Sequence, residues 1–273
     1  MTHPRQSLCF SALVCTLPSF ALANPLTFKV EIDGYQAKSL QVLPQNQPKP
    51  EQDCRRPTAV SQAAKAVEAA GWQVISEVTL AGYDLVSFAA ESSIGPSGVC
   101  EYSDSNLSVF SGDKLQGLFW GQEKQGKLFG SLEAASESIV TINHSAFPVV
   151  PVAELAFAEQ NFILQALPAT FKGCDDQVEV PNLWMEPIGK MREGLMTLGW
   201  KPLEFKPTEL ISEHIQSFGF KEVESCSGTG QNYCSFEYQI SAAKLRVITI
   251  GEMGDSYQPM VVDYELLCQS LAE

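Results

Sequence analysis

Basic residues are scarce in this chain of 273 residues, which has 18 Lys and Arg against 32 Asp and Glu and a formal net charge of −14. A nucleic-acid-binding protein needs a basic face to neutralise phosphates, so this class is excluded as the default. Charged residues make up only 18% of the chain, whereas 45% are hydrophobic. This balance is typical of a folded globular protein, and the length suits one large domain or two ordinary ones.

Histidine is also scarce, and only His144 and His214 lie beyond the N-terminal segment. A serine hydrolase needs a histidine oriented by an acid, and the chain has no Gly-x-Ser-x-Gly motif. Both histidines are expected to be ordinary surface residues. The many acids offer numerous carboxylate pairs for glycoside hydrolysis, and none stands out. We therefore expect no catalytic constellation, no cofactor and no metal site.

The first 23 residues have the three parts of a secretory signal peptide. A polar stretch with Arg5 precedes an apolar run from Leu8 to Leu17, and Ala21-Leu22-Ala23 forms a cleavage site. Polar residues and Pro18 interrupt the run, which is too short to span a bilayer. We expect cleavage after Ala23 and a mature protein in the periplasm or outside the cell, without a transmembrane segment.

The two halves of the chain resemble each other at a shift of 128 residues, as shown by Trp72 and Trp200. Apolar residues in 60–72 and 188–200 recur at i, i+3, i+7 and i+10, as on one face of a helix. Each segment ends in Gly-Trp, which is typical of a helix end with a left-handed glycine. A cysteine precedes each helix and a cysteine-x-aromatic strand follows it, so the order indicates an internal repeat.

Six cysteines lie beyond the expected cleavage site: Cys54, Cys100, Cys174, Cys226, Cys234 and Cys268. An even number in an oxidising compartment indicates three disulfides, and no C-x-x-C spacing suggests zinc. Cys226 and Cys234 flank a loop between two expected strands and can face each other. Cys174 and Cys268 are expected at one end of the C-terminal unit, which leaves Cys54 with Cys100. The repeat gives an alternative, in which Cys174 pairs with Cys234 and Cys226 with Cys268.

The second copy predicts two helices, ending before Gly199 and Gly219, and then four strands in an antiparallel meander that ends at Cys268. The expected fold class is therefore α+β, with two tandem related units of helices packed on an antiparallel sheet. The expected domains are a signal peptide at 1–23, a β-hairpin with a Pro-rich linker at 24–50, a first unit with a β-rich extension at 51–170, and a second unit at 171–273. Such a unit leaves one sheet face open to water or to a partner.

A glycine-rich loop joins two of these strands, from Ser227 to Tyr233. A phosphate cradle would connect a strand to a helix, so a hairpin loop is the better interpretation. A loop held by a disulfide loses little entropy on binding. The candidate contacts for a partner are Gly228, Thr229, Gly230 and Tyr233 in this loop, with Tyr257 further along the chain.

The second copy resembles a group of small exported bacterial proteins over residues 174–252. The resemblance rests on Gly199-Trp200, the segment Cys226-Ser227-Gly228-Thr229-Gly230, and Cys234-Ser235-Phe236. It implies secretion rather than a particular activity. The tandem architecture with an acidic surface is also similar to secreted β-lactamase-inhibitory proteins, an analogy of fold that carries over no residue or target.

These features favour an exported protein-binding module, such as an inhibitor or an immunity protein. Loss of Arg5 with the leader leaves 17 basic and 32 acidic residues, a charge of −15. That charge would steer a basic partner, such as an enzyme that acts on the cell envelope. Two alternatives stay open: a carboxylate-dependent envelope enzyme and a structural envelope component without catalysis.

Overall fold

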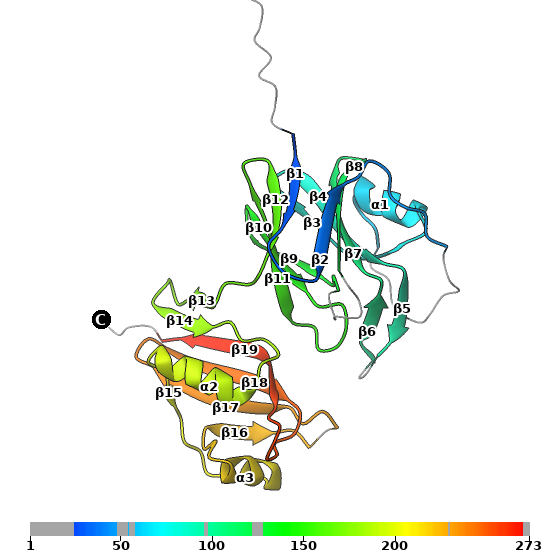
Figure 1. Ribbon diagram of the computed structural model, residues 1–273. Helices are drawn as coiled ribbons and strands as arrows, with labels where there is room; N and C mark the ends of the chain where they lie inside the picture. Colours follow the sequence, from blue (N-terminus) through cyan, green and yellow to red (C-terminus); the bar gives the residue numbers. More distant parts are fainter. Residues whose placement is uncertain are drawn as a thin grey trace, which may run out of the picture.

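The computed structural model describes residues 25–47, 54, 58–95, 98–121, 128–228 and 230–269. The expected signal peptide and Thr229 lie outside these residues. Figure 1 shows two parts that follow one another along the chain, and the chain passes from the first part to the second between β12 and β13. Within the described residues, none of the helices has the length and hydrophobicity needed to cross a bilayer.

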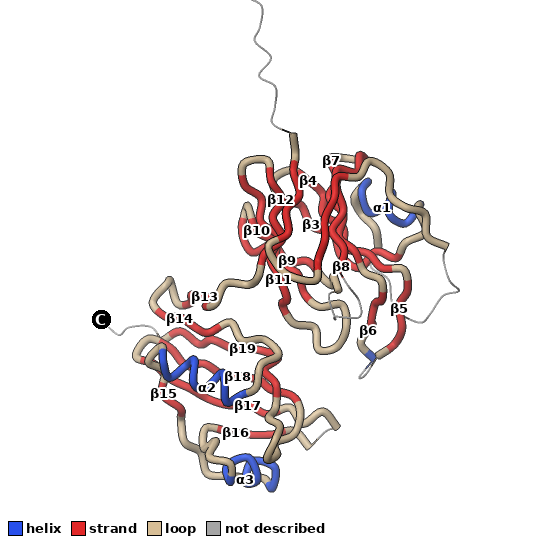
Figure 2. The backbone as a smooth tube through the Cα atoms, viewed as in Figure 1, coloured by secondary structure: helices blue, strands red, loops and turns tan. Residues whose placement is uncertain are grey.

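The expected α+β class is wrong, because the protein is mostly β-sheet, with 48% strand and 12% helix. The three helices of the described residues are short: α1 (Gln62–Ala69), α2 (Ile188–Thr197) and α3 (Leu210–Ser217). Only α1 lies in the N-terminal part (Figure 2). The alternating apolar segments after Leu107 form further strands, so much of the N-terminal core lies between two sheets rather than between helices and a sheet.

The N-terminal part is a sandwich of two five-stranded sheets. The first sheet has the order β2 (Tyr35–Ser39), β8 (Lys114–Gly121), β7 (Asn106–Ser111), β4 (Tyr83–Ala89) and β3 (Gln73–Leu80). The second has the order β1 (Thr27–Val30), β12 (Asn161–Gln165), β11 (Pro151–Ala158), β10 (Ile139–Asn143) and β9 (Leu132–Ser136). Phe119 from the first sheet, Phe162 from the second and Phe129 are fully buried in the core between them.

The expected N-terminal hairpin is wrong, because its two strands do not pair with each other. β1 pairs in parallel with β12, whereas β2 pairs with β8 in the other sheet. The turn at Asp33 and Gly34, where Gly34 has a φ of 83°, therefore leads the chain from one sheet to the other. Partners distant in sequence outcompete the neighbouring strand, because each strand completes a sheet that has an apolar face to bury.

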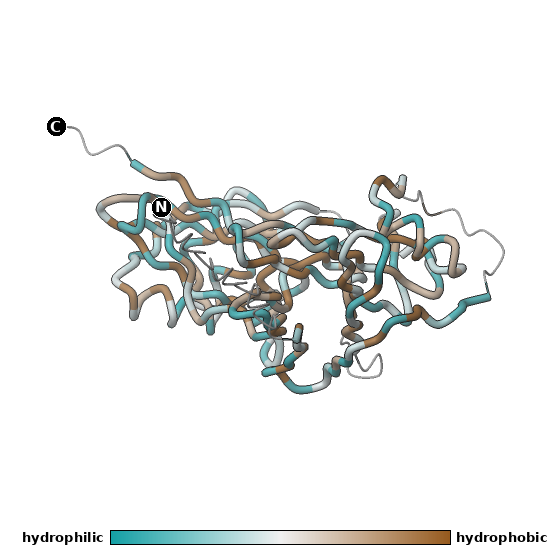
Figure 3. The backbone as a smooth tube through the Cα atoms, turned by 90° about the horizontal axis from the view of Figure 1, so that it is seen from above, coloured by the Kyte–Doolittle hydropathy of each residue, from teal (hydrophilic) through white to brown (hydrophobic). Residues whose placement is uncertain are grey.

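Helix α1 covers the outer face of the first sheet. Ala63, Ala64 and Val67 of the helix are fully buried and pack in one cluster with Val86 and Phe88 of β4. A small hairpin, β5 (Glu91–Ile94) with β6 (Cys100–Ser103), extends from the same sheet. Figure 3 shows hydrophobic and hydrophilic residues interspersed along the backbone of both parts.

The C-terminal part has two helices and an antiparallel sheet. A hairpin of β13 (Thr170–Gly173) and β14 (Val178–Pro181) precedes α2, and the two-residue β15 (Lys201–Pro202) follows it. The meander then runs through β16 (Val223–Cys226), β17 (Cys234–Ile240), β18 (Ala243–Ile250) and β19 (Met260–Cys268). The core under the helices contains Met191, Leu195, Ile215, Phe236 and Tyr238.

The three preferred cysteine pairings are confirmed, and the alternative drawn from the repeat is wrong. Cys54 pairs with Cys100, Cys174 with Cys268, and Cys226 with Cys234. Cys226 and Cys234 lie opposite each other on β16 and β17, at the base of the loop that joins these strands. The bond from Cys174 fixes the β13–β14 connection to the end of β19.

Helices α1 and α2 end in the same way at their Gly-Trp pairs. Gly71 and Gly199 have φ values of 87° and 88°, a left-handed conformation that suits glycine. The indole Nε1 of Trp72 donates to the carbonyl oxygen of Pro44 at 2.7 Å, and that of Trp200 donates to the carbonyl oxygen of Glu179 at 2.8 Å. In both cases the indole ties the end of the helix to the segment that leads into it.

Candidate functional site

Two loops and a helix meet at one end of the C-terminal sheet. The β16–β17 loop and the β18–β19 loop are joined by a hydrogen bond from Gly251 N to Gln231 O, 3.0 Å long. Helix α3 lies beside the second loop, where His214 Nε2 is 3.0 Å from the carbonyl oxygen of Met253. The end of the sheet that holds both predicted loops is therefore also bordered by α3.

A hollow of about 350 Å³ lies between α3 and these loops. It is lined by Leu210, Ile211, His214, Ile215, Asn232, Gly251, Glu252, Met253 and Tyr257. Ile215 and Met253 are buried and form an apolar floor, while Leu210 is 84% exposed at the rim. The predicted candidate Tyr257 is part of this lining and is 56% exposed.

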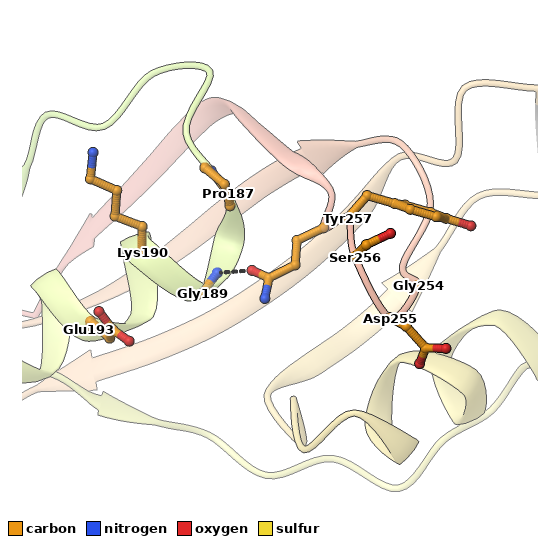
Figure 4. A pocket seen from close by; sticks show the side chains of 9 residues that line it. Pro187, Gly189, Lys190, Glu193, Gly254, Asp255, Ser256 and Tyr257 are labelled. Carbon is orange, nitrogen blue, oxygen red and sulfur yellow. Dashed lines mark hydrogen bonds between the residues drawn. The ribbon is translucent and has the colours of Figure 1, made fainter.

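A second, more polar hollow of about 480 Å³ lies on the other side of Tyr257 (Figure 4). It is formed by the start of α2, with Pro187 and Lys190, and by the loop from Gly254 to Gln258. Gln258 Oε1 accepts a hydrogen bond from Gly189 N at 2.8 Å and so caps α2, which has no side-chain cap at Pro187. In Figure 4 the Tyr257 ring points away from α2, so it stands between the two hollows.

The position of the Tyr257 ring depends on Gly254. Gly254 N donates to Tyr257 O at 3.0 Å, which closes the tip of the β18–β19 loop. A Cβ atom placed on Gly254 would approach the tyrosine ring to 2.5 Å. The ring therefore lies directly on the glycine backbone, and only glycine leaves room for it there.

Acidic side chains surround the two hollows. Glu252 lines the first hollow, and Glu193 and Asp255 line the second. All three are exposed, and no ion pair is formed by any of them within the described part of the chain. Lys190, the basic residue of the second hollow, is paired with Glu186 at 2.7 Å. Negative charge is therefore in excess around Tyr257.

The predicted glycine-rich loop lies next to the first hollow, and of its described residues Asn232 alone is part of the lining. Gly228 and Gly230 are exposed, and a Cβ atom on either would meet nothing within 4 Å. Tyr233 is 38% exposed, and its carbonyl oxygen accepts from Ser227 N at 2.7 Å. Tyr257 is thus the candidate that the structure places in a hollow, while these three residues border an open loop.

Sequence reasoning missed the residues of α3 and Glu252. The sequence did hold a signal for Leu210. It is the first residue of a short helix, and Ile211 and Ile215 are enough to form the apolar face of that helix. An additional large apolar residue there has no core to enter, and it is exposed. Glu252 gave no signal, because one acid among 32 is uninformative until the fold places it.

The face of the sheet opposite the helices carries a cluster of charges centred on Arg246. Its guanidinium contacts Glu237 Oε1 at 2.7 Å, Glu265 Oε2 at 2.9 Å and Glu224 Oε2 at 3.4 Å. The hydrogen bond that Arg246 donates to Glu237 and the charges of the three carboxylates raise the pKa of Arg246. One cation shared by three anions leaves this cluster with a negative charge.

His144, His214 and the buried Glu222 all have partners within the fold. His144 Nδ1 is 3.1 Å from the carbonyl oxygen of Ala146, and His214 contacts Met253 as described. Glu222 is fully buried, 3.2 Å from Arg192 Nε and 3.1 Å from the hydroxyl of Tyr238. Within the described ranges, no three His, Cys, Asp or Glu side chains are grouped so that they could hold a metal ion.

The comparisons with known proteins identify no relative. No family model matches the chain, and neither the curated proteins nor the solved structures include one that is significantly similar to it.

Proposed function

We propose that the protein is an exported, disulfide-stabilised module that binds another protein through the loop end of its C-terminal sheet. The observation that carries this proposal is the exposed ring of Tyr257, which lines two hollows and lies against Gly254. Large aromatic side chains in such positions are common anchors of protein interfaces. Export rests on the sequence of residues 1–23, with cleavage after Ala23.

The loops are suited to binding because much of their conformation is fixed in advance. Cys226 and Cys234 close the base of the first loop, and the bond from Gly251 to Gln231 ties the second loop to the first. Gln258 anchors the second loop to α2. A surface that is ordered before binding loses less conformational entropy when a partner covers it.

The charge of the protein favours a basic partner. The net charge of −14 raises the local concentration of cationic proteins, and the acids around Tyr257 place part of that charge at the proposed surface. An envelope-acting enzyme with a basic active-site cleft has the matching character, and the protein would then act as its inhibitor or immunity protein.

The similarity of the two Gly-Trp segments supports a further proposal, that both parts contain one duplicated unit. In each part a helix ends at Gly-Trp and leads at once into a strand at the sheet edge, β3 or β15. The next strand inward, β4 or β17, is followed in order by two more antiparallel strands. The relation to small exported bacterial proteins stays a prediction.

The test of the proposed function is capture of a partner from a periplasmic extract at low and moderate salt. We expect the wild-type protein to retain one partner in stoichiometric amount, and less of it as salt rises. Tyr257→Ala combined with Leu210→Ser should lose it, whereas Val42→Ser, at a 75% exposed position of the N-terminal part, should retain it. Failure to capture any partner at either salt, or turnover of an envelope substrate that depends on one Asp or Glu, would contradict the proposal.

A further inference from the structure

We infer that the hollow between α3 and the β18–β19 loop receives an arginine-bearing segment of the partner. In this arrangement the guanidinium lies on the Tyr257 ring and pairs with Glu252 or Asp255, while a neighbouring aliphatic side chain enters the hollow. The inference rests on the proposed protein-binding function and adds the chemistry of what is bound.

The size and lining of the hollow favour a single apolar side chain. Its volume of about 350 Å³ is near the lower end of the range of small-molecule pockets, roughly 300–1,000 Å³. Its floor, Ile215 and Met253, has no free charge, and Ile211 is half-buried beside it. Leu210 at the rim gives the entering side chain an additional apolar contact that water now covers.

The rim on the loop side favours a cation. Tyr257 offers an exposed aromatic face, and Glu252 and Asp255 come from the same loop, five and two residues before it. Neither carboxylate has an ion pair among the described residues, so each is available to a partner. An aromatic ring beside free carboxylates is a setting in which a cation gains both a cation–π contact and a charged hydrogen bond.

Arginine fits this setting better than lysine. The guanidinium is planar, stacks on aromatic rings, is weakly hydrated and can present two N–H groups to one carboxylate. An ammonium group is more strongly hydrated and binds as a point charge. The proximity of an apolar hollow and a cation site further requires that the two side chains be close in the bound segment.

The groove beside α1 provides a contrast. It is lined by Val42, Leu43, Ala66, Phe110 and other residues, and it has an exposed apolar side chain in Val42. Among its described lining residues Asp113 is the one acid, and the one aromatic side chain, Phe110, is buried. This groove lacks an exposed aromatic ring with two free carboxylates beside it, so it should not select an arginine-bearing segment.

The test is an NMR titration of the isotope-labelled full chain with capped model peptides. The probes are Gly-Arg-Leu-Arg-Gly and versions with Lys or Glu in place of both arginines, or Ser in place of Leu. We expect saturable amide shifts at 210–215, 232 and 251–257 with the Arg-Leu-Arg peptide. Affinity should fall roughly threefold with lysine, because an ammonium is more strongly hydrated and cannot present two N–H groups to one carboxylate, and about tenfold with Ser or Glu, which remove the apolar contact or the cation.

The variants decide whether the surface is specific. Tyr257→Ala should abolish the saturable shifts, Tyr257→Phe should preserve them, and Val42→Ser should leave them unchanged. No saturation up to about 10 mM peptide, ten times the concentration that half-saturates a site with a Kd of about 1 mM, would overturn the inference. It would also be overturned by shifts spread evenly over the acidic surface, including the Arg246 face. In each variant the dispersion of the remaining amide signals reports that the protein is folded.

The outcome is separable from that of the proposed function. If the wild-type protein and Tyr257→Ala capture the same partner equally well, the protein binds a partner, but this hollow is not where the partner binds. If the peptide binds specifically but the extract yields no partner, the arginine site in the hollow is supported and the proposed function is contradicted.

Discussion

The two parts of the molecule differ in whether the second face of the helix-bearing sheet is covered. In the N-terminal part, α1 covers one face of the first sheet, and the second sheet covers the other with Phe119 buried between them. In the C-terminal part, α2 and α3 cover one face, and the other carries Arg246 and its three glutamates. Figure 1 shows α2 in front of the C-terminal sheet.

The difference lies in the outward residues of corresponding strands. Leu85 on β4 points into the sandwich core, whereas Glu237 on β17 points toward Arg246. Apolar side chains require a second sheet to cover them, and charged side chains require water or a charged partner. A similar helix end and strand order can thus form a closed core in one place and an exposed surface in the other.

The largest effect is expected from the disulfide that closes the longest loop. Cys174 and Cys268 are 94 residues apart, whereas Cys226 and Cys234 are 8 apart. Replacing the first pair by alanine should lower the free energy of unfolding by about 4–5 kcal/mol, and replacing the second by about 2–3 kcal/mol, because a longer closed loop restricts the unfolded chain more. Urea unfolding of both double variants measures this, and the reverse order would contradict the expectation.

Substitutions in the two sheets should then separate the covered face from the open one. Phe119→Ala should lower the free energy of unfolding by about 3–5 kcal/mol, because it leaves a cavity in a closed core. Arg246→Ala should cost less, about 1–2 kcal/mol, because the pairs with Glu224 and Glu265 are screened by solvent while the Glu237 carboxylate, 10% exposed, loses its hydrogen-bond donor. Urea titration with fluorescence detection compares them, and a cost for Arg246→Ala as large as that for Phe119→Ala would show that the open face is not open.

The most gradual effect is a loss of stability in alkali. Burial raises the pKa of Tyr35 to about 12, and burial with the nearby Glu222 charge raises the pKa of Tyr238. Stability is complete below pH 10, where unfolded tyrosine still holds its proton. Above it the unfolded state ionises first, so the free energy of unfolding should fall by about 1.4 kcal/mol per pH unit for each such tyrosine.

Tyr238→Phe provides the matched control for this pH dependence. It removes one ionising group from the C-terminal core and leaves Tyr35 in the N-terminal part unchanged. Urea unfolding between pH 8 and 11 should show a shallower slope in the variant. Equal slopes would mean that Tyr238 loses its proton in the folded protein as readily as in the unfolded one.

Local signals in the sequence predicted the features that depend on neighbouring residues. The Gly-Trp helix ends, the meander from β16 to β19 and the hairpin disulfide of Cys226 and Cys234 all follow from short spacings. The second N-terminal sheet could not be predicted in this way. Its β1 strand pairs with β12, as Thr27 does with Asn161, and alternation of apolar residues does not identify a partner so far along the chain.

The candidate site was predicted only in part for the same reason. Tyr257 could be selected because an aromatic residue close to glycine in a loop is unusual, and it lines the hollow. Leu210 and Glu252 belong to the site only because α3 folds back against the β18–β19 loop, with His214 beside Met253. Whether a residue joins a surface of this kind is decided by tertiary packing.

The loop that carries Tyr257 also completes the first turn of α2. Gln258 Oε1 accepts from Gly189 N, and the carbonyl oxygen of Pro259 accepts from Ile188 N at 3.0 Å. Any displacement of the loop would leave these helix N–H groups without acceptors, which resists rearrangement. The loop is therefore held in one conformation by the helix that it caps, and a molecule that bound there would have to adjust its own shape to it.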